Sequence, residues 1–401
     1  MEPVPGKRRF GLAAVAALIA FTAACERPAD AGVNGDASGG GAGERAAVAP
    51  LSVSAPAHGA TKVPIITAVT LAVREVSNVS ISVTGPSGRV VPGGYHPATR
   101  VWRPVSSLAW GTAYAVSASG RTSAGRTVST ASSFTTMRRP AKLARVSSQL
   151  GDNAAVGVGM PLVVRFSHPV PAAKRDDVQR RMFVTAKPAQ VGAWRWVSGT
   201  EVRYRTKRYW KSKTSITFGV RTRGLYVGNG RYGDNDLSVK IKTGPGIVMT
   251  ISNKTKHMTV KRNGKVLRRI PVSLGKPKTP SSSGTMLIMQ KLKKTRFNTI
   301  DELGPDEGYD IEVHYAQRIT WGGEFLHAAP WSVAAQGKRN VSHGCVNMST
   351  KNARWLFGIT TIGDPVTTTG TEVKLRLGNG WTDWNIPWKQ WTKGSALPVK
   401  V

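Results

Sequence analysis

The chain has 401 residues and a formal net charge of +35, because 57 lysines and arginines stand against only 22 aspartates and glutamates. So basic a chain could bind nucleic acid, but it contains no helix-turn-helix pattern, zinc-finger spacing or aromatic-basic platform, so we expect no nucleic-acid partner. Its seven histidines and two cysteines show no metal-ligand spacing, so we expect neither a metal nor another cofactor.

Residues 1–25 have the order of an export signal. A positive start at Lys7-Arg8-Arg9 precedes an apolar run over 10–21, and Thr22-Ala23-Ala24-Cys25 resembles a lipoprotein processing site, although Thr22 replaces the usual Leu or Val. We expect a lipid on Cys25 that anchors the exported chain to the membrane, facing the cell wall. Ordinary cleavage nearby and a retained anchor are the alternatives. Residues 26–50, rich in Ala, Gly, Asp and Ser, predict a flexible linker.

Two segments, 51–139 and 140–243, each predict an antiparallel β-sandwich. Apolar and small polar residues alternate with period two between turns rich in Gly and Pro, and each segment has the size of an immunoglobulin-like domain. The clearest predicted strands are 51–54, 69–73, 79–84, 113–117, 162–166, 202–204 and 216–220. Neither segment contains a catalytic constellation, so we expect spacers and docking surfaces.

Residues 244–375 predict a third, β-rich module with one short helix. Strands are expected at 247–251, 257–260 and 266–270, with an Asn263-Gly264 hairpin turn, and Ser349 is expected to cap a helix over 350–357 that Gly358 ends. The polar stretch 291–308 suits a mobile flap. Residues 376–401 predict a small C-terminal subdomain whose Trp381, Trp384, Trp388 and Trp391 form core and lid packing rather than a sugar platform.

The third module contains the stretch with the clearest chemistry, Ser342-His343-Gly344-Cys345-Val346-Asn347. A thiolate attacks carbonyl groups, and Gly344 would let main-chain N–H groups around His343 and Cys345 form an oxyanion hole. His343 is too near in sequence to act as base, because neighbouring side chains diverge. We therefore expect His327 to be the base, with its other ring nitrogen held by a main-chain carbonyl.

Cysteine usage supports the same interpretation. If Cys25 is lipidated or removed, Cys345 has no disulfide partner, and an unpaired thiol outside the cytoplasm is exposed to oxidation. A lone cysteine or histidine is more often structural. Their combination in this order and spacing favours catalysis.

His327, followed after fourteen residues by Ser342 to Asn347, resembles the signature of the L,D-transpeptidase catalytic domain. The chain from about residue 246 onward is similar to multidomain actinobacterial members that make 3→3 peptidoglycan cross-links. The resemblance implies two immunoglobulin-like domains ahead of the catalytic domain. It also implies that Cys345 attacks a donor stem tetrapeptide, releases D-alanine, and passes the acyl group to the side-chain amine of a diamino acid.

The substrate-binding residues are expected around this pair. The resemblance implies that Tyr309 closes on the donor and that Trp331 and Ser342 belong to the site, and that a main-chain carbonyl at Ala328 holds the base. Gly322 and Gly323 would let a substrate backbone approach closely. Asn347 would bind substrate or hold the loop, two roles that the sequence does not separate.

Two other functions stay open. The first is a thiol hydrolase, an L,D-carboxypeptidase that trims tetrapeptides with water as acceptor. The second is a catalytically inert wall-binding lipoprotein, which covalent labelling by a carbapenem would argue against. In each case the expected partners are peptidoglycan stem peptides, together with anionic wall polymers or lipid head groups that the basic surface attracts.

Overall fold

The computed structural model describes residues 49–300, 304 and 308–399. The predicted signal, Cys25 and nearly all of the predicted linker lie outside the described residues. Strands dominate the described part and its helices are short, which confirms the predicted fold class. None of those helices has the length and apolarity that a membrane crossing requires.

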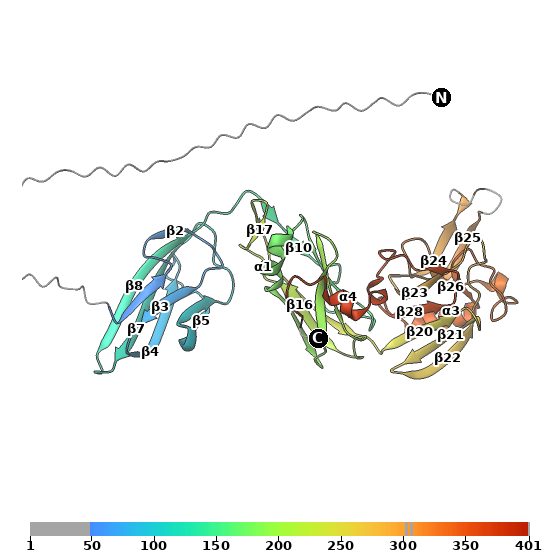
Figure 1. Cartoon of the computed structure of the whole chain (residues 1–401), viewed down its shortest axis with the longest axis horizontal. Coiled ribbons are helices and arrows are strands. Elements are labelled where there is room, and N and C mark those ends of the chain that lie inside the picture. The colour runs from blue at the N-terminus through green and yellow to red at the C-terminus, as the bar shows by residue number, and fades with distance from the viewer. Residues whose placement is uncertain (1–48, 301–303, 305–307, 400–401) are drawn as a thin grey trace, which may run out of the picture. The chain divides into compact units, whose positions relative to one another are not determined.

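The first sandwich consists of two four-stranded sheets, ordered β1-β3-β6-β5 and β2-β8-β7-β4 (Figure 1). Its elements are β1 (Leu51–Ala55), β2 (Ala60–Val63), β3 (Val69–Val73), β4 (Val76–Thr84), β5 (Gly93–His96), the 3-10 helix η1 (Pro97–Thr99), β6 (Val101–Pro104), β7 (Ala113–Thr122) and β8 (Thr127–Thr136). Buried and exposed residues alternate along β7, as period two requires. The sequence predicted an antiparallel sandwich, but the β2–β8 pair is parallel.

The second sandwich has sheets ordered β10-β12-β15-β14 and β11-β19-β16-β13, and a smaller sheet β17-β18-β9. Its elements are β9 (Leu143–Ala144), β10 (Val146–Ser147), β11 (Ala154–Val156), β12 (Leu162–Phe166), η2 (Ala172–Lys174), α1 (Arg175–Gln179), β13 (Met182–Lys187), β14 (Gly192–Trp196), β15 (Glu201–Thr206), β16 (Ser215–Val220), β17 (Tyr226–Gly228), β18 (Arg231–Gly233) and β19 (Leu237–Thr243). The sequence-predicted strands of both sandwiches are present.

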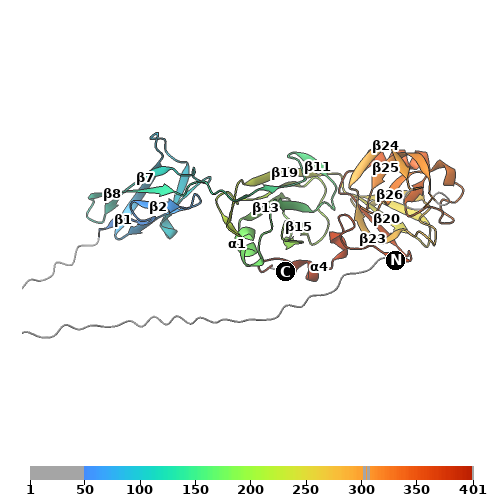
Figure 2. The same ribbon diagram turned by 90° about the horizontal axis from the view of Figure 1, so that it is seen from above.

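The third module has a six-stranded sheet, β22-β21-β20-β28-β23-β29, and a four-stranded sheet, β24-β25-β26-β27 (Figure 2). Its elements are β20 (Ile247–Ser252), β21 (His257–Arg262), β22 (Lys265–Pro271), β23 (Ser282–Leu287), β24 (Gln290–Asn298), β25 (Asp310–Arg318), β26 (Phe325–Ala328), η3 (Pro330–Ser332), β27 (Val346–Met348), α3 (Thr350–Ile359), β28 (Pro365–Thr369) and β29 (Val373–Lys374). Leu326, Val346 and Leu356 belong to its core, so β26, β27 and α3 pack together.

Local sequence explains most of this module. Asn263 and Gly264 have φ of 49° and 83°, the left-handed pair that a two-residue hairpin turn needs. Ser349 Oγ accepts the Asn352 N–H at 3.3 Å and caps α3 as predicted. The predicted end at Gly358 is wrong, because α3 continues to Ile359. The predicted flap is also partly wrong, because residues 290–298 are paired with β25 as strand β24.

The C-terminal segment packs on the second sandwich, as α4 does in Figure 1. It contains η4 (Asp383–Asn385) and α4 (Trp388–Thr392). Trp391 is fully buried, and its indole N–H donates to the Ala193 carbonyl at 2.9 Å. The Arg205 guanidinium lies 4.7 to 5.4 Å from the ring centres of Trp384, Trp388 and Trp391. The predicted tryptophan packing therefore has a partner that the sequence did not indicate.

Candidate active site

Strand register brings the predicted nucleophile and base to one face of a sheet. Strands β26 and β27 are parallel, and His327 is the register partner of Asn347. Cys345 lies in the bend just before β27, two residues ahead of Asn347, and its side chain lines the same cavity as those of Asn347 and His327. The residues that the sequence placed in one motif therefore converge because two short strands lie next to each other.

Both residues line one cavity of about 340 Å³. Seven of the predicted site residues are among its walls: Tyr309, His327, Trp331, Ser342, His343, Cys345 and Asn347. Four apolar wall residues were not predicted, namely Phe297, Ile311, Val313 and Val341. The only sequence signal for them is the alternation of Ile311 and Val313, which places both on one face of β25.

His327 is 3% exposed and has a defined tautomer. Its Nδ1 lies 2.9 Å from the Ala328 carbonyl oxygen, and because a carbonyl only accepts, Nδ1 carries the proton. This is the main-chain carbonyl expected from the sequence. Burial lowers the pKa of His327 to about 4, against the opposing effect of hydrogen bonds to Ala328 and Asn347. The imidazole is therefore neutral at neutral pH, with Nε2 free of a proton.

Cys345 is buried beside the glycine turn that precedes β26. Its thiol donates to the Gly323 carbonyl, with 3.6 Å between Sγ and oxygen. Burial raises the pKa of Cys345 to about 12; a Phe325 backbone hydrogen bond opposes this rise, whereas the Glu324 charge adds to it. The resting site therefore holds a neutral thiol and a neutral imidazole rather than a thiolate-imidazolium pair.

The loop that carries Cys345 is held by hydroxyl groups. Ser342 Oγ donates to the Cys345 carbonyl at 2.6 Å and accepts the Gly344 N–H at 3.2 Å. Ser281 Oγ donates to the Gly344 carbonyl at 2.6 Å. Gly344 has φ of +120°, a region that residues with a side chain rarely adopt. The glycine is thus needed for its conformation, and its N–H already has an acceptor in Ser342.

Aromatic rings surround the cavity. The Tyr309 and His343 ring centres are 5.2 Å apart, and the Phe297 ring meets the His327 ring edge-on at 5.4 Å. Burial, with a contribution from Cys345, raises the pKa of Tyr309 to about 12, so its hydroxyl stays protonated. Trp331 is 55% exposed and its ring centre is 6.2 Å from that of His327. Trp331 therefore offers an uncovered ring next to the base.

The two predicted glycines, Gly322 and Gly323, lie in the turn between β25 and β26 rather than on a strand edge. The Gly322 N–H donates to Asn379 Oδ1 at 2.7 Å. Neither glycine lines the cavity, and Gly323 contributes through the carbonyl that accepts the Cys345 thiol. The sequence predicted that these glycines leave a strand edge open to the substrate backbone, but both lie in a turn.

A partly buried carboxylate, Glu324, lies next to the nucleophile, and no motif in the sequence indicates it. Glu324 accepts hydrogen bonds from Ser282 Oγ at 2.6 Å and from the Ser282 N–H at 3.2 Å, and burial raises its pKa. It precedes β26, and a Cβ atom added to Gly344 of the nucleophile loop would lie 3.8 Å from Glu324 Cγ. Among the described residues, no three His, Cys, Asp or Glu side chains are grouped so that they could hold a metal ion.

Comparisons with known proteins agree with this architecture. Residues 60–226 match a model for a bacterial Ig domain, and residues 247–368 match one for the L,D-transpeptidase catalytic domain. The chain is 31% identical to L,D-transpeptidase 2 of Mycobacterium tuberculosis over 86% of this chain and 85% of that protein. It is 30% identical to L,D-transpeptidase 5 of the same species, over 87% and 78% respectively. A solved structure of an L,D-transpeptidase from Mycobacterium smegmatis covers 57% of this chain and 99% of its own, at 30% identity and a TM-score of 0.47.

Proposed function

Because the chain belongs to the L,D-transpeptidase family, we propose that it forms 3→3 cross-links between peptidoglycan stem peptides, with Cys345 as nucleophile and His327 as general base. The observation that carries this proposal is that both side chains line one cavity of about 340 Å³, His327 from β26 and Cys345 from the bend just before β27. A thiol and an unprotonated imidazole nitrogen in one buried site are the parts that acyl transfer requires.

The first step is acylation of the enzyme. Nε2 of His327 takes the proton from the Cys345 thiol while the sulfur attacks the carbonyl carbon of the third donor residue. The tetrahedral intermediate collapses, the bond to the terminal D-alanine breaks, and His327 gives the proton to the departing amine. A thioester on Cys345 and one free D-alanine result, with no change in oxidation state.

The second step transfers the acyl group. The side-chain amine of a diamino acid on an acceptor stem attacks the thioester carbonyl, and His327 accepts a proton from that amine. The new amide bond forms as the carbon–sulfur bond breaks, and the proton returns to the sulfur. With water in place of the amine, the same chemistry trims the donor to a tripeptide.

Because both residues are neutral at rest, the proton of the Cys345 thiol can pass to His327 only during the reaction. A thiol with a pKa of about 12 and an imidazole with a pKa of about 4 do not exchange a proton before the substrate arrives. Proton transfer must therefore accompany the attack, when the developing imidazolium and oxyanion stabilise each other. Because the Gly344 N–H is bound to Ser342 Oγ, the main-chain N–H groups of His343 and Cys345 are the proposed oxyanion donors. Tyr309 and Trp331 are the proposed walls against the donor peptide.

The site of action is proposed to be the outer face of the membrane. The signal-like start and Cys25 support export and lipid anchoring, and the net charge of +35 supports attraction to anionic wall polymers or lipid head groups. Such attraction is weakened by salt.

The test is intact-mass analysis of the full chain mixed with a purified stem tetrapeptide. The proposal expects an adduct equal to the donor minus D-alanine on Cys345, and none on a Cys345→Ala chain. Adding an acceptor stem separates the two acyl acceptors: a cross-linked dimer indicates transpeptidation, and tripeptide alone indicates hydrolysis. A folded chain that gains no mass from either the tetrapeptide or a carbapenem would instead be an inert wall-binding protein.

A further inference from the structure

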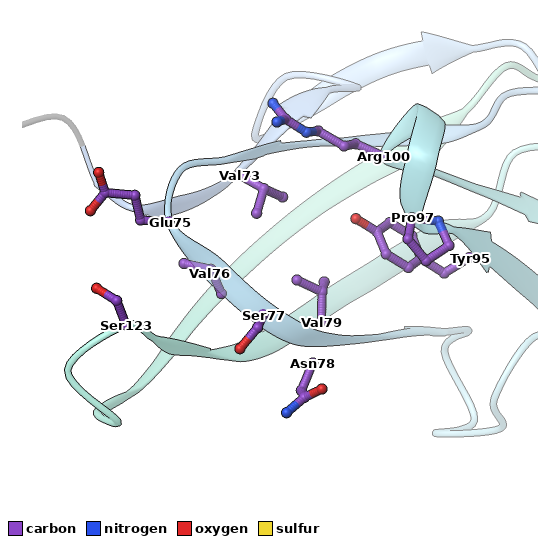
Figure 3. A pocket seen from close by; sticks show the side chains of 10 residues that line it. All are labelled: Val73, Glu75, Val76, Ser77, Asn78, Val79, Tyr95, Pro97, Arg100 and Ser123. Atoms are coloured by element: carbon purple, nitrogen blue, oxygen red, sulfur yellow. The ribbon is translucent and has the colours of Figure 1, made fainter.

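The first sandwich has a cavity of its own, of about 780 Å³ (Figure 3). Its walls come from the end of β3, the start of β4, and η1 with the residues that flank it, together with Ser123 after β7. None of these residues belongs to the third module. The cavity is therefore a feature of the first sandwich alone.

Strained backbone collects around this cavity. Of the ten non-glycine residues with positive φ in the described chain, three line it: Glu75 at 52°, Asn78 at 51° and Arg100 at 56°. Asparagine tolerates the left-handed region, whereas Glu and Arg side chains are disfavoured there by about 1 kcal/mol or more. Such strain persists where the surrounding structure fixes it, often at binding sites.

The fold around Asn78 has adapted to this strain. Asn78 lies in a bulge of β4, where the register against β7 shifts between Ser77 and Ser80. Opposite the bulge is Gly120, where a Cβ atom would lie only 2.4 Å from Val76 Cγ1. The missing side chain on β7 thus makes room for the bulge. The bulge in turn sets Asn78 at the cavity wall.

Three charged and polar residues at the cavity wall are exposed to solvent: Glu75, Asn78 and Arg100. Within the described part of the chain, the side chains of Glu75, Asn78 and Arg100 form no hydrogen bond or ion pair. Val73, Val76 and Val79 supply an apolar wall, and Figure 3 shows Val73 between Glu75 and Arg100. The cavity therefore presents one acid and one base, with apolar surface beside them.

We infer that this cavity binds a short peptide carrying both a free amine and a free carboxylate. Glu75 would pair with the ammonium group, Arg100 would hold the carboxylate through its fork of donors, and the valines would contact methyl side chains. A polyanion would require a cluster of cations, and a glycan would require more aromatic surface than Tyr95 provides. The two opposite charges favour the zwitterionic peptide.

A stem tetrapeptide with a diamino acid has this chemistry, and its choice as the ligand rests on the proposed function. A second site for the same peptide on another module would hold the chain on uncross-linked wall. Two linked weak sites bind more tightly than either alone, because the second binding event is intramolecular. The inference thus gives the first sandwich a role that a spacer would not have.

The test is photo-crosslinking of the full chain with a stem tetrapeptide that carries a diazirine, followed by mass mapping of the labelled peptides. We expect adducts on the segment between Glu75 and Arg100. Glu75→Gln and Arg100→Gln should each weaken labelling of that segment about five-fold. The matched charge control is Arg74→Gln, because Arg74 is an exposed neighbour outside the cavity wall and its removal should change nothing.

Modified ligands sharpen the test. Amidating the ligand's carboxylate should weaken labelling of the wild-type protein but should not weaken labelling of Arg100→Gln any further. Acetylating the ligand's amine should likewise weaken labelling of the wild-type protein but should not weaken labelling of Glu75→Gln any further. Absence of label in this segment, equal labelling of all variants, or equal competition by peptide-free glycan strands would overturn the inference. Thioester formation on Cys345 is read from the same samples. A chain that is acylated on Cys345 but carries no label at 75–100 would contradict only the second binding site. A chain that is labelled at 75–100 but not acylated would contradict only the proposed function.

Discussion

Asn347 is the register partner of His327 across the parallel strands β27 and β26; its side chain donates to Ser332 Oγ at 3.2 Å, and it opposes the burial that lowers the pKa of His327. The base is therefore held by the Ala328 carbonyl, with the Asn347 amide in the neighbouring strand. The sequence left two roles open for Asn347, binding substrate or holding the loop. The structure adds a third, which is orientation of the base.

Replacing Asn347 with alanine should slow acylation about 10- to 100-fold, because the imidazole loses the amide that lies opposite it in the neighbouring strand. The measurement is the rate of Cys345 acylation by a carbapenem or a tetrapeptide donor. Ser332→Ala is the matched control, since it removes only the outer hydroxyl and should cost much less. Equal rates in wild type and Asn347→Ala would contradict the orienting role.

The rate of acylation should be nearly independent of pH from about pH 5 to about pH 9. His327 becomes protonated and stops acting as a base only as the pH falls towards its pKa of about 4, and the Cys345 thiol ionises only near its pKa of about 12. Ultraviolet difference spectra of wild type against Cys345→Ala should show no thiolate at neutral pH. A thiolate signal at pH 7, or a rate that rises steeply between pH 6 and pH 8, would refute the neutral resting pair.

Two glycine-to-alanine changes should have opposite effects. Gly344 has φ of +120°, so Gly344→Ala should destabilise the fold by about 1–2 kcal/mol and distort the nucleophile loop. Gly358 is exposed within α3 with nothing near its missing side chain, so Gly358→Ala should stabilise by about 0.5–1 kcal/mol and leave acylation unchanged. Denaturant unfolding and acylation rates test both, and a tolerated Gly344→Ala would show that the loop does not need this conformation.

Two tryptophans should separate stability from activity. Trp391 is fully buried against the second sandwich, so Trp391→Ala should lower the free energy of unfolding by about 3–5 kcal/mol. Trp331 is 55% exposed beside His327, so Trp331→Ala should leave stability within about 0.5 kcal/mol and raise the KM for the donor. A stable Trp391→Ala chain would mean that the C-terminal segment is not needed to hold the fold.

Structural features that depend only on residues close together in the sequence could be predicted from it. The Asn263-Gly264 turn and the Ser349 cap are examples, since the residues that decide them lie within a few positions of each other. The catalytic pair was predictable as a motif, although the parallel pairing of β26 and β27 that unites it was not. Parallel pairing joins strands distant in sequence, and no local signal specifies it.

Features that depend on distant residues escaped prediction. Trp391 packs on Ala193 and Arg205, almost two hundred positions earlier in the chain, and its sequence neighbours contain no sign of that partner. Gly358 read as a helix stop because glycine often is one, but the Thr360 N–H still reaches the Leu356 carbonyl at 3.1 Å. The left-handed backbone conformation of Glu75 and Arg100 could not be predicted either, since neither residue type favours it.

Acyl transfer by Cys345 is tested most directly by the mass of the intact chain after mixing with a purified stem tetrapeptide. We expect the protein to gain the mass of the donor less one D-alanine, peptide mapping to place this gain on Cys345, and Cys345→Ala to gain nothing. A correctly folded wild-type chain that stays at its starting mass while donor and a reactive carbapenem are both present would contradict acyl transfer by Cys345.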